Sequence, residues 1–179
     1  MSRYRRARTE GATYFFTVNT YRRQALLTHP DTRATLRDAI RLVRTAMPFT
    51  IDAWGLMPDH LHAIWTLPHN DAAYGKRWGM IKAQVSRRCA HLVQPATAES
   101  RIKRHEIDFW QRRFGEHQIR DDIDFERHAD YIHYNPVKHG LVTQVAQWPY
   151  STFHRYMKNG VYPSDWGVDP GEVSGNAGK

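Results

Sequence analysis

Cysteine and long apolar runs are the features that this sequence has least of. Cys89 is the only cysteine, so no disulfide can form within the chain. No stretch approaches the roughly 18 consecutive apolar residues of a membrane-spanning helix. The apolar stretch 14–18 is too short for the core of a secretion signal. We therefore expect a cytoplasmic protein, since a reducing compartment suits a chain without disulfides.

Negative charge is scarce relative to positive charge. The 179 residues include 26 Lys and Arg against 18 Asp and Glu, a net charge of +8. This excess is typical of proteins whose partner is rich in phosphate, and it favours association with the nucleoid. An anionic membrane would attract the same charge, but no basic amphipathic helix stands out. The length suits one core with additions, so we predict a basic arm over 1–10, a domain over 11–142 and a C-terminal extension over 143–179.

Hydrophobic periodicity predicts an α/β fold of the α+β sandwich type. Alternating patterns and β-branched or aromatic residues indicate strands at 14–21, 49–56, 60–67 and 107–114. Apolar spacings of three and four residues indicate helices at 31–47, 76–92, 122–135 and 151–158, and the segment 93–106 is expected to be a loop. The resulting β-α-β-β-α-β-α order is typical of a ferredoxin-like or RRM-like four-stranded antiparallel sheet with helices on one face. The helix at 122–135 follows this core and is free to cross the sheet.

His60 and His62 form the most informative local pattern. Side chains two residues apart on a strand share a face, so both imidazoles can reach one cation. Leu61 would then point into a core on the opposite face. Because 11 of the 179 residues are histidine, the pair alone does not establish a metal site.

Tyr131 and Asn135 supply what the histidine pair lacks. They lie at positions i and i+4 of the predicted helix at 122–135, so their side chains are neighbours on one face. The amide oxygen of Asn135 can be a third ligand beside two imidazoles, and Tyr131 can reach the group that the cation polarises. A helical tyrosine is otherwise most often a packing residue.

Three separated motifs resemble those of the REP-associated tyrosine transposases, single-tyrosine members of the HUH nuclease superfamily. They are MPDHLHAIWTLP at 57–68, WQRRF at 110–114 followed by Glu116-His117, and YIHYNPVKHGLV at 131–142. The similarity runs from about Arg3 to the segment 148–153, so it covers most of the chain.

The resemblance implies roles for four residues of these motifs. His60 and His62 are implied as metal ligands, Asn135 as the third ligand and Tyr131 as the nucleophile. The implied cofactor is a divalent cation, Mg²⁺ or Mn²⁺, and the implied partner is single-stranded DNA with a REP-type palindromic hairpin, bound by a monomer. Attack by Tyr131 would give a 5′-phosphotyrosine and free a 3′-hydroxyl, and the retained phosphodiester lets the step be reversed without ATP.

Basic and aromatic side chains are the expected DNA contacts. The proposed phosphate contacts are Arg3, Arg5, Arg6, Arg112, Arg113 and Lys138, with Trp110 or Tyr4 as a platform on which a base could stack. Tyr134 is expected to pack or to touch DNA, since a Tyr-x-x-Tyr spacing does not place both phenols one turn apart. The roles of Glu116 and His117 stay open.

Two other functions fit parts of this pattern. A non-catalytic nucleic-acid-binding module could use the same RRM-like sheet, but it would not need two histidines, a tyrosine and an asparagine together. A different HUH nuclease, of the replication initiator or relaxase type, is disfavoured by the short chain and the single tyrosine so placed.

Overall fold

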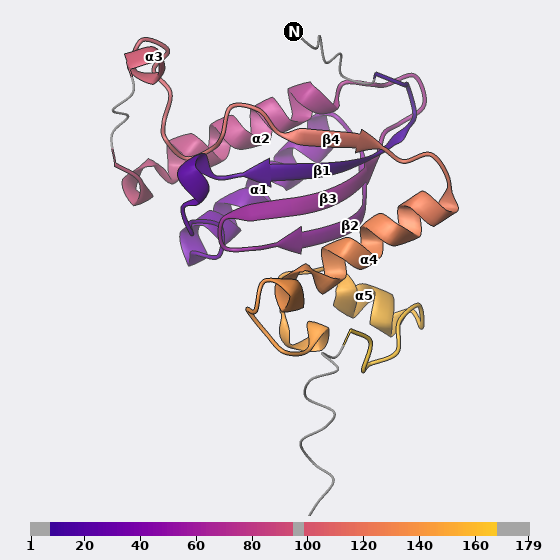
Figure 1. Cartoon of the computed structure of the whole chain (residues 1–179). Helices are drawn as coiled ribbons and strands as arrows, with labels where there is room; N and C mark the ends of the chain where they lie inside the picture. The colour runs from indigo at the N-terminus through magenta and orange to yellow at the C-terminus, as the bar shows by residue number, and fades with distance from the viewer. Residues whose placement is uncertain (1–7, 95–98, 168–179) are drawn as a thin grey trace, which may run out of the picture.

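The chain folds around one antiparallel sheet of four strands (Figure 1). The computed structural model describes residues 8–94 and 99–167. The strands are β1 (Thr13–Asn19), β2 (Thr50–Leu56), β3 (His60–Thr66) and β4 (Gly115–Gln118), and their order in space is β2-β3-β1-β4. Each neighbouring pair is antiparallel, so the predicted four-stranded α+β sheet is confirmed.

Helices lie on both faces of this sheet. The two core helices, α1 (Pro30–Ala46) and α2 (Tyr74–Arg88), share the face that lies behind the sheet in Figure 1. The later helix α4 (Asp122–Lys138) crosses the opposite face, as the sequence predicts, and α5 (Phe153–Lys158) packs near its C-terminal end. The short elements are η1 (Tyr21–Arg23), η2 (Ala90–Leu92), α3 (Glu99–Ile102) and η3 (Val145–Gln147). Within the described residues no helix is long and apolar enough to cross a membrane.

The alternation along β3 divides its side chains between two environments. Leu61, Ala63 and Trp65 point into the main core, where the Trp65 and Trp78 rings stack with centroids 4.1 Å apart. The opposite phase of β3 faces α4, and Ile64 packs there against residues of that helix. The sequence pattern therefore places both histidines of β3 on the face that α4 covers.

The fourth strand lies later in the chain than predicted, and the prediction of a strand over 107–114 is wrong. Phe109 and Trp110 are adjacent, yet both are buried, so the side chains do not alternate between core and solvent there. An ion pair with the buried Arg101 holds Asp108, and pairing with β1 begins only in β4. The polar sequence of β4, Gly-Glu-His-Gln, carries no hydrophobic alternation that would predict a strand.

A close approach between α4 and β2 fixes the helix on the sheet. A Cβ atom at Gly55 would lie 2.9 Å from the Cγ2 atom of Ile132 and 3.1 Å from its carbonyl oxygen, so glycine is required there. The helix also runs through Pro136 to Lys138, although the sequence predicts that it ends at Asn135. Packing of α4 on the sheet and on the C-terminal segment outweighs the loss of one helical hydrogen bond at proline.

The C-terminal segment holds the far end of α4. Val137 packs with Val145 and Phe153 in a small separate cluster. Beside it, the Nε2 atom of His133 forms a hydrogen bond of 2.9 Å with the Oγ1 atom of Thr152. Thr152 in turn forms hydrogen bonds with the backbone N–H and carbonyl of Trp54 on β2. These contacts attach the C-terminal end of α4 to β2, to the segment that follows α4 and to α5.

Candidate active site

The structure brings His60, His62, Tyr131 and Asn135 together between β3 and α4. Both histidines are 3% exposed and Asn135 is fully buried. The His60 and His62 ring centroids lie 4.9 Å apart, and the Nε2 atom of His60 lies 3.1 Å from the Oδ1 atom of Asn135. The ring of Tyr131 lies edge-on to His62, with centroids 5.1 Å apart. Residues more than 65 positions apart in sequence thus meet at one point of the sheet.

Asp59 and Arg23 hold His60 from behind. The Nδ1 atom of His60 lies 2.7 Å from Asp59 Oδ1, and Arg23 Nε lies 2.7 Å from the other carboxylate oxygen. Partial burial raises the pKa of Asp59, but the hydrogen bond to His60 and the neighbouring positive charges outweigh it and lower the pKa overall. The carboxylate therefore stays ionised and orients the imidazole.

This orientation leaves two electron pairs facing each other. When His60 donates its Nδ1 proton to Asp59, the Nε2 atom of the neutral ring carries a lone pair and points at the Oδ1 atom of Asn135. Two acceptors 3.1 Å apart repel each other unless a proton or a cation lies between them. Nitrogen and oxygen ligands of one divalent cation have about this separation, given bond lengths of about 2.0–2.2 Å.

His62 lies beside His60 and offers a third potential ligand atom. Its Nδ1 atom lies 2.9 Å from the Oγ1 atom of Thr17 on β1, the residue paired with it across the sheet. Its Nε2 atom is buried and has no hydrogen-bond partner among the described residues. Burial is the largest cause that lowers the pKa of His62, to about 3, so the ring is neutral. A neutral imidazole with an unpartnered nitrogen is a good ligand for a divalent cation, and the residues present fit one.

Tyr131 is the accessible member of the group. It is 38% exposed, and the ammonium of Lys138 lies 4.9 Å from the centre of its ring. The Phe15 ring packs beside two members of the site, with centroids 5.4 Å from that of His62 and 6.1 Å from that of Tyr131. A cavity of about 360 Å³ opens beside the phenol and is lined by Phe15, Thr17, Arg127, His128 and Tyr131. A strand of DNA can therefore approach Tyr131 from solvent while the histidines stay buried.

Tyr134 occupies a different environment from Tyr131. It is partly buried in the cluster at the end of α4, with its ring 6.4 Å from that of Trp166. Packing is one of the two roles expected for it. His139 does reach the site, because its ring lies 5.2 Å from that of His60.

The structure separates the expected DNA contacts into three groups. Arg3, Tyr4, Arg5 and Arg6 lie outside the described residues. Arg112 and Arg113 are exposed, although Arg112 is paired with Glu106, and Lys138 lies over the phenol of Tyr131. Trp110 is 4% exposed and packed in the main core, so its ring has no free face for a base and the stacking role expected for it is not supported.

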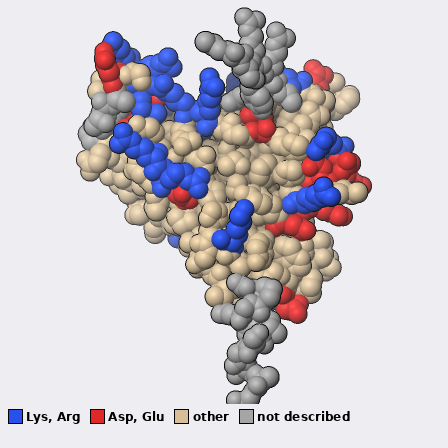
Figure 2. All heavy atoms as spheres, in the orientation of Figure 1, with Lys and Arg blue, Asp and Glu red and all other residues tan. Residues whose placement is uncertain are grey.

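Arg112 lines a groove that is rich in basic side chains. It runs between α2 and the segment 101–112, has a volume of about 530 Å³, and its lining includes five cationic side chains and one carboxylate. These side chains are Lys82, Arg87, Arg101, Arg104, Arg112 and Glu106. Figure 2 shows Lys and Arg gathered over this part of the molecule, near α3, whereas acidic side chains gather around the start of α4.

Sequence reasoning did not find the residues that orient the two histidines. Asp59 directly precedes His60, so its position in the sequence is a local signal that it could contact that histidine. Thr17 carries no local signal, because its contact with His62 depends on the register between β1 and β3. Phe15 likewise reaches the site only through its place on β1.

Comparisons with known proteins find a matching family and similar chains. Residues 9–135 match the family described as "Transposase IS200 like". The chain is 44% identical over 174 residues to the REP-associated tyrosine transposase of Escherichia coli K12, covering 97% of this chain and 96% of that protein. It is 43% identical to a Haemophilus influenzae protein whose name places it in the same group, covering 95% and 96% of the two chains. The solved structure of a REP-associated tyrosine transposase bound to a REP hairpin is 45% identical, covers 94% of this chain and 93% of that one, and superposes with a TM-score of 0.79.

Proposed function

This chain belongs to the IS200-like transposase family and is a tyrosine transposase of the REP-associated group, and from this premise we propose that it cuts and rejoins single-stranded DNA beside REP-type palindromic hairpins. The observation that carries the proposal is the exposed phenol of Tyr131 beside two buried imidazoles. The Nε2 atom of His60 faces Asn135, and the Nε2 atom of His62 has no hydrogen-bond partner in the described part of the chain. A binding module would not need this buried arrangement.

We assign the nucleophile to Tyr131. Its phenolic oxygen would attack the scissile phosphorus while the bond from phosphorus to the 3′ oxygen breaks. The phenol loses its proton, the departing 3′ oxygen gains one, and the phosphate stays attached to the 5′ side as a phosphotyrosine. Because one phosphodiester replaces another, a free 3′-hydroxyl can reverse the step and join a strand without ATP.

His60, His62 and Asn135 would hold a divalent cation, Mg²⁺ or Mn²⁺. When bound, such a cation would bind a non-bridging phosphate oxygen and offset the charge that develops during attack. The three protein ligands are all neutral, so they supply no negative charge of their own. We therefore expect the affinity for Mn²⁺ to rise when single-stranded DNA supplies a phosphate, and calorimetry of Tyr131→Phe with and without DNA measures this. Equal affinities would contradict the assignment.

The basic surface would bind the DNA outside the cleavage site. We propose that the groove beside α2, with Arg112 on its rim, and Arg113 bind phosphates of the hairpin, and that Lys138 binds the strand nearest to Tyr131. We further propose that residues 1–10 are a DNA-binding arm, that 11–142 form the catalytic domain and that the protein acts as a monomer in the cytoplasm, on the nucleoid. Deleting residues 2–8 should weaken hairpin binding and reduce the dependence of log Kd on log salt concentration. An unchanged salt dependence would exclude the arm from binding.

A pair of tyrosine variants tests the proposed reaction. The protein is incubated with single-stranded DNA that contains a REP palindrome and its flanks, with Mn²⁺ or Mg²⁺, and denaturing gels then separate any covalent protein–DNA adduct. Tyr131→Phe should lose the adduct and keep hairpin binding, whereas Tyr134→Phe should keep both. An adduct that survives in Tyr131→Phe but is lost in Tyr134→Phe would reverse the assignment, and hairpin binding without any adduct would favour the non-catalytic module.

A further inference from the structure

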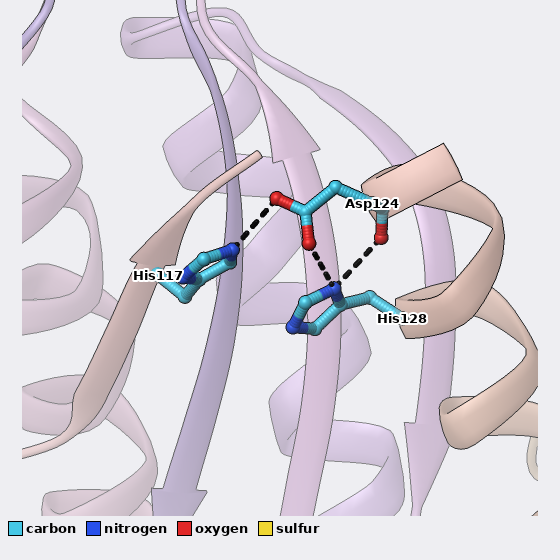
Figure 3. Close-up of side chains that lie close together, drawn as sticks. All are labelled: His117, Asp124 and His128. Atoms are coloured by element: carbon cyan, nitrogen blue, oxygen red, sulfur yellow. Dashed lines mark hydrogen bonds and ion pairs between the residues drawn. The ribbon is translucent and has the colours of Figure 1, made fainter. Parts of the chain in front are cut away.

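A second group of potential metal ligands lies beside the candidate active site, on the outer side of Phe15. It consists of His117 on β4, with Asp124 and His128 on the first turns of α4 (Figure 3). His117 Nε2 lies 2.8 Å from Asp124 Oδ2, and His128 Nδ1 lies 3.2 Å from Asp124 Oδ1. The two imidazole rings lie nearly parallel, at an angle of 16° and with centroids 4.7 Å apart. Both rings thus direct a nitrogen towards the same carboxylate.

The three potential donor atoms lie close together. One nitrogen from each imidazole and one carboxylate oxygen lie within 4.8 Å of one another. Asp124 and His128 are at positions i and i+4 of a helix, a spacing that directs two ligands to one side, and β4 supplies the third ligand from a neighbouring element. Two imidazoles and one carboxylate are a donor set for Zn²⁺ and related transition metals, and they are less suited to Mg²⁺ or Ca²⁺, which prefer oxygen ligands.

The charges around this group are compatible with a cation. The hydrogen bond from His117, together with donors of Arg120, lowers the pKa of Asp124 to about 2, so its carboxylate is ionised at neutral pH. The Arg120 side chain is 75% exposed and its Nε atom lies 3.4 Å from that carboxylate, so the guanidinium can turn to solvent when a cation enters. His117 is about one-third exposed, which gives the cation a path from solvent.

The existing hydrogen bonds would be replaced by bonds to the cation. His117 would lose its Nε2 proton and carry one on Nδ1. His128 Nδ1 also contacts the carbonyl oxygen of Asp124 at 2.8 Å, and it would give up that contact to become a ligand.

We propose that His117, Asp124 and His128 form a second cation site, of the Zn²⁺ type, that fastens β4 to α4. The edge strand β4 has four residues and pairs with β1, so a cation shared with α4 would add a link between this strand and the helix. His128 is one turn before Tyr131 and its ring packs on Phe15 with centroids 4.7 Å apart. A cation there would therefore reduce the motion of the helix turn that carries the nucleophile. The site binds its cation whether or not the protein cleaves DNA.

Metal titration of variants tests this proposal separately from the proposed function. The metal-stripped full chain is titrated with Zn²⁺ by calorimetry, and with Co²⁺ as an optical probe, without DNA. In the background His60→Ala with His62→Ala, one equivalent should still bind. Adding His117→Gln or Asp124→Asn to that background should weaken this binding at least 10-fold.

His91→Gln is the matched control for these variants. The Nε2 atom of His91 lies 3.1 Å from a carboxylate oxygen of Asp31, so it forms the same kind of pair, but it belongs to no three-ligand group among the described residues. This variant should bind as tightly as its parent. An equal loss in His91→Gln and His117→Gln would show that Zn²⁺ binds nonspecifically to surface histidines and would overturn the proposal.

A measurement on the unaltered chain guards against variants that do not fold. Zn²⁺ should shift or broaden the imidazole NMR signals of His117 and His128 at one equivalent, and it should raise the Tm. If Zn²⁺ leaves these two imidazoles unperturbed at a tenfold excess, the site does not exist, whatever happens at His60 and His62.

Discussion

Replacing Gly55 by alanine should displace the helix that carries the proposed nucleophile. The added Cβ atom would lie 2.9 Å from Cγ2 of Ile132 and 3.1 Å from its carbonyl oxygen, whereas ordinary contacts lie at 3.4–4 Å. Ile132 can turn its side chain, but its carbonyl belongs to the backbone, so α4 itself must move away by a few tenths of an ångström. Introducing one methyl group into a packed core in this way costs about 1–3 kcal/mol.

The same displacement should lower activity more than the loss of stability explains. Tyr131 and Asn135 flank Ile132 on α4, and Asn135 Oδ1 must stay near its 3.1 Å distance from His60 Nε2. A misplacement of about 1 Å in a reacting group can cost on the order of 100-fold in rate. At a temperature where Gly55→Ala is fully folded, we expect adduct formation to be about 10-fold slower, with hairpin affinity nearly unchanged.

Gly79→Ala supplies the same substitution with the opposite expected sign. Gly79 is exposed in α2, and a Cβ atom there would meet nothing within 4 Å among the described residues. Alanine is favoured over glycine inside a helix by about 0.8–1.0 kcal/mol, so this variant should be more stable than the parent and equally active. Urea unfolding gives the free energies of unfolding, and the adduct assay gives the rates. A Gly55→Ala variant as stable and as fast as Gly79→Ala would refute the close-approach argument.

Two further substitutions test individual contacts. Thr17→Val keeps the shape of the side chain but removes the hydroxyl that lies 2.9 Å from Nδ1 of His62, so the Mn²⁺ concentration for half-maximal adduct should rise about 10-fold; an unchanged requirement would exclude an orienting role. Asp124→Asn should destabilise the fold at neutral pH, because the hydrogen bond from His117 lowers the pKa of the folded carboxyl to about 2, below its unfolded value near 3.8. That stabilisation is complete above about pH 4 and is lost as the pH falls towards 2, so the unfolding curves of the two proteins should converge over this interval; a constant difference would contradict the assignment.

The parts of the fold that the sequence predicts are those where one local pattern decides the structure. The alternation from His60 to Trp65 predicts a strand and identifies the face with the histidines, because side-chain direction repeats every two residues. The i and i+4 spacing of Tyr131 and Asn135 predicts that they are neighbours. In both cases the relevant partners are close in sequence, and the resemblance to a family supplies the long-range link between them.

The parts that the sequence does not predict depend on contacts between distant segments. The strand β4 has a polar sequence and forms because β1 offers an unpaired edge. The contact between Thr17 and His62 follows from strand register, which no single segment encodes. The predicted strand over 107–114 would place the adjacent side chains of Phe109 and Trp110 on opposite faces. Both are buried in the core instead, because the chain bends there around the buried Arg101.

Asn135 and Pro136 show how a local preference yields to the site. A proline disfavours helical geometry in the residue that precedes it, yet Asn135 lies within α4 and its amide oxygen lies close to His60. Pro136 has no N–H to donate to the carbonyl oxygen of Ile132, and that oxygen is the atom that lies against Gly55. Proline on the helix and glycine on the strand therefore serve the same close approach: the one removes a competing donor and the other removes a side chain. The segment after Pro136 then resumes helical hydrogen bonding, with His139 donating to the carbonyl of Asn135, so the helix keeps the third proposed ligand in place.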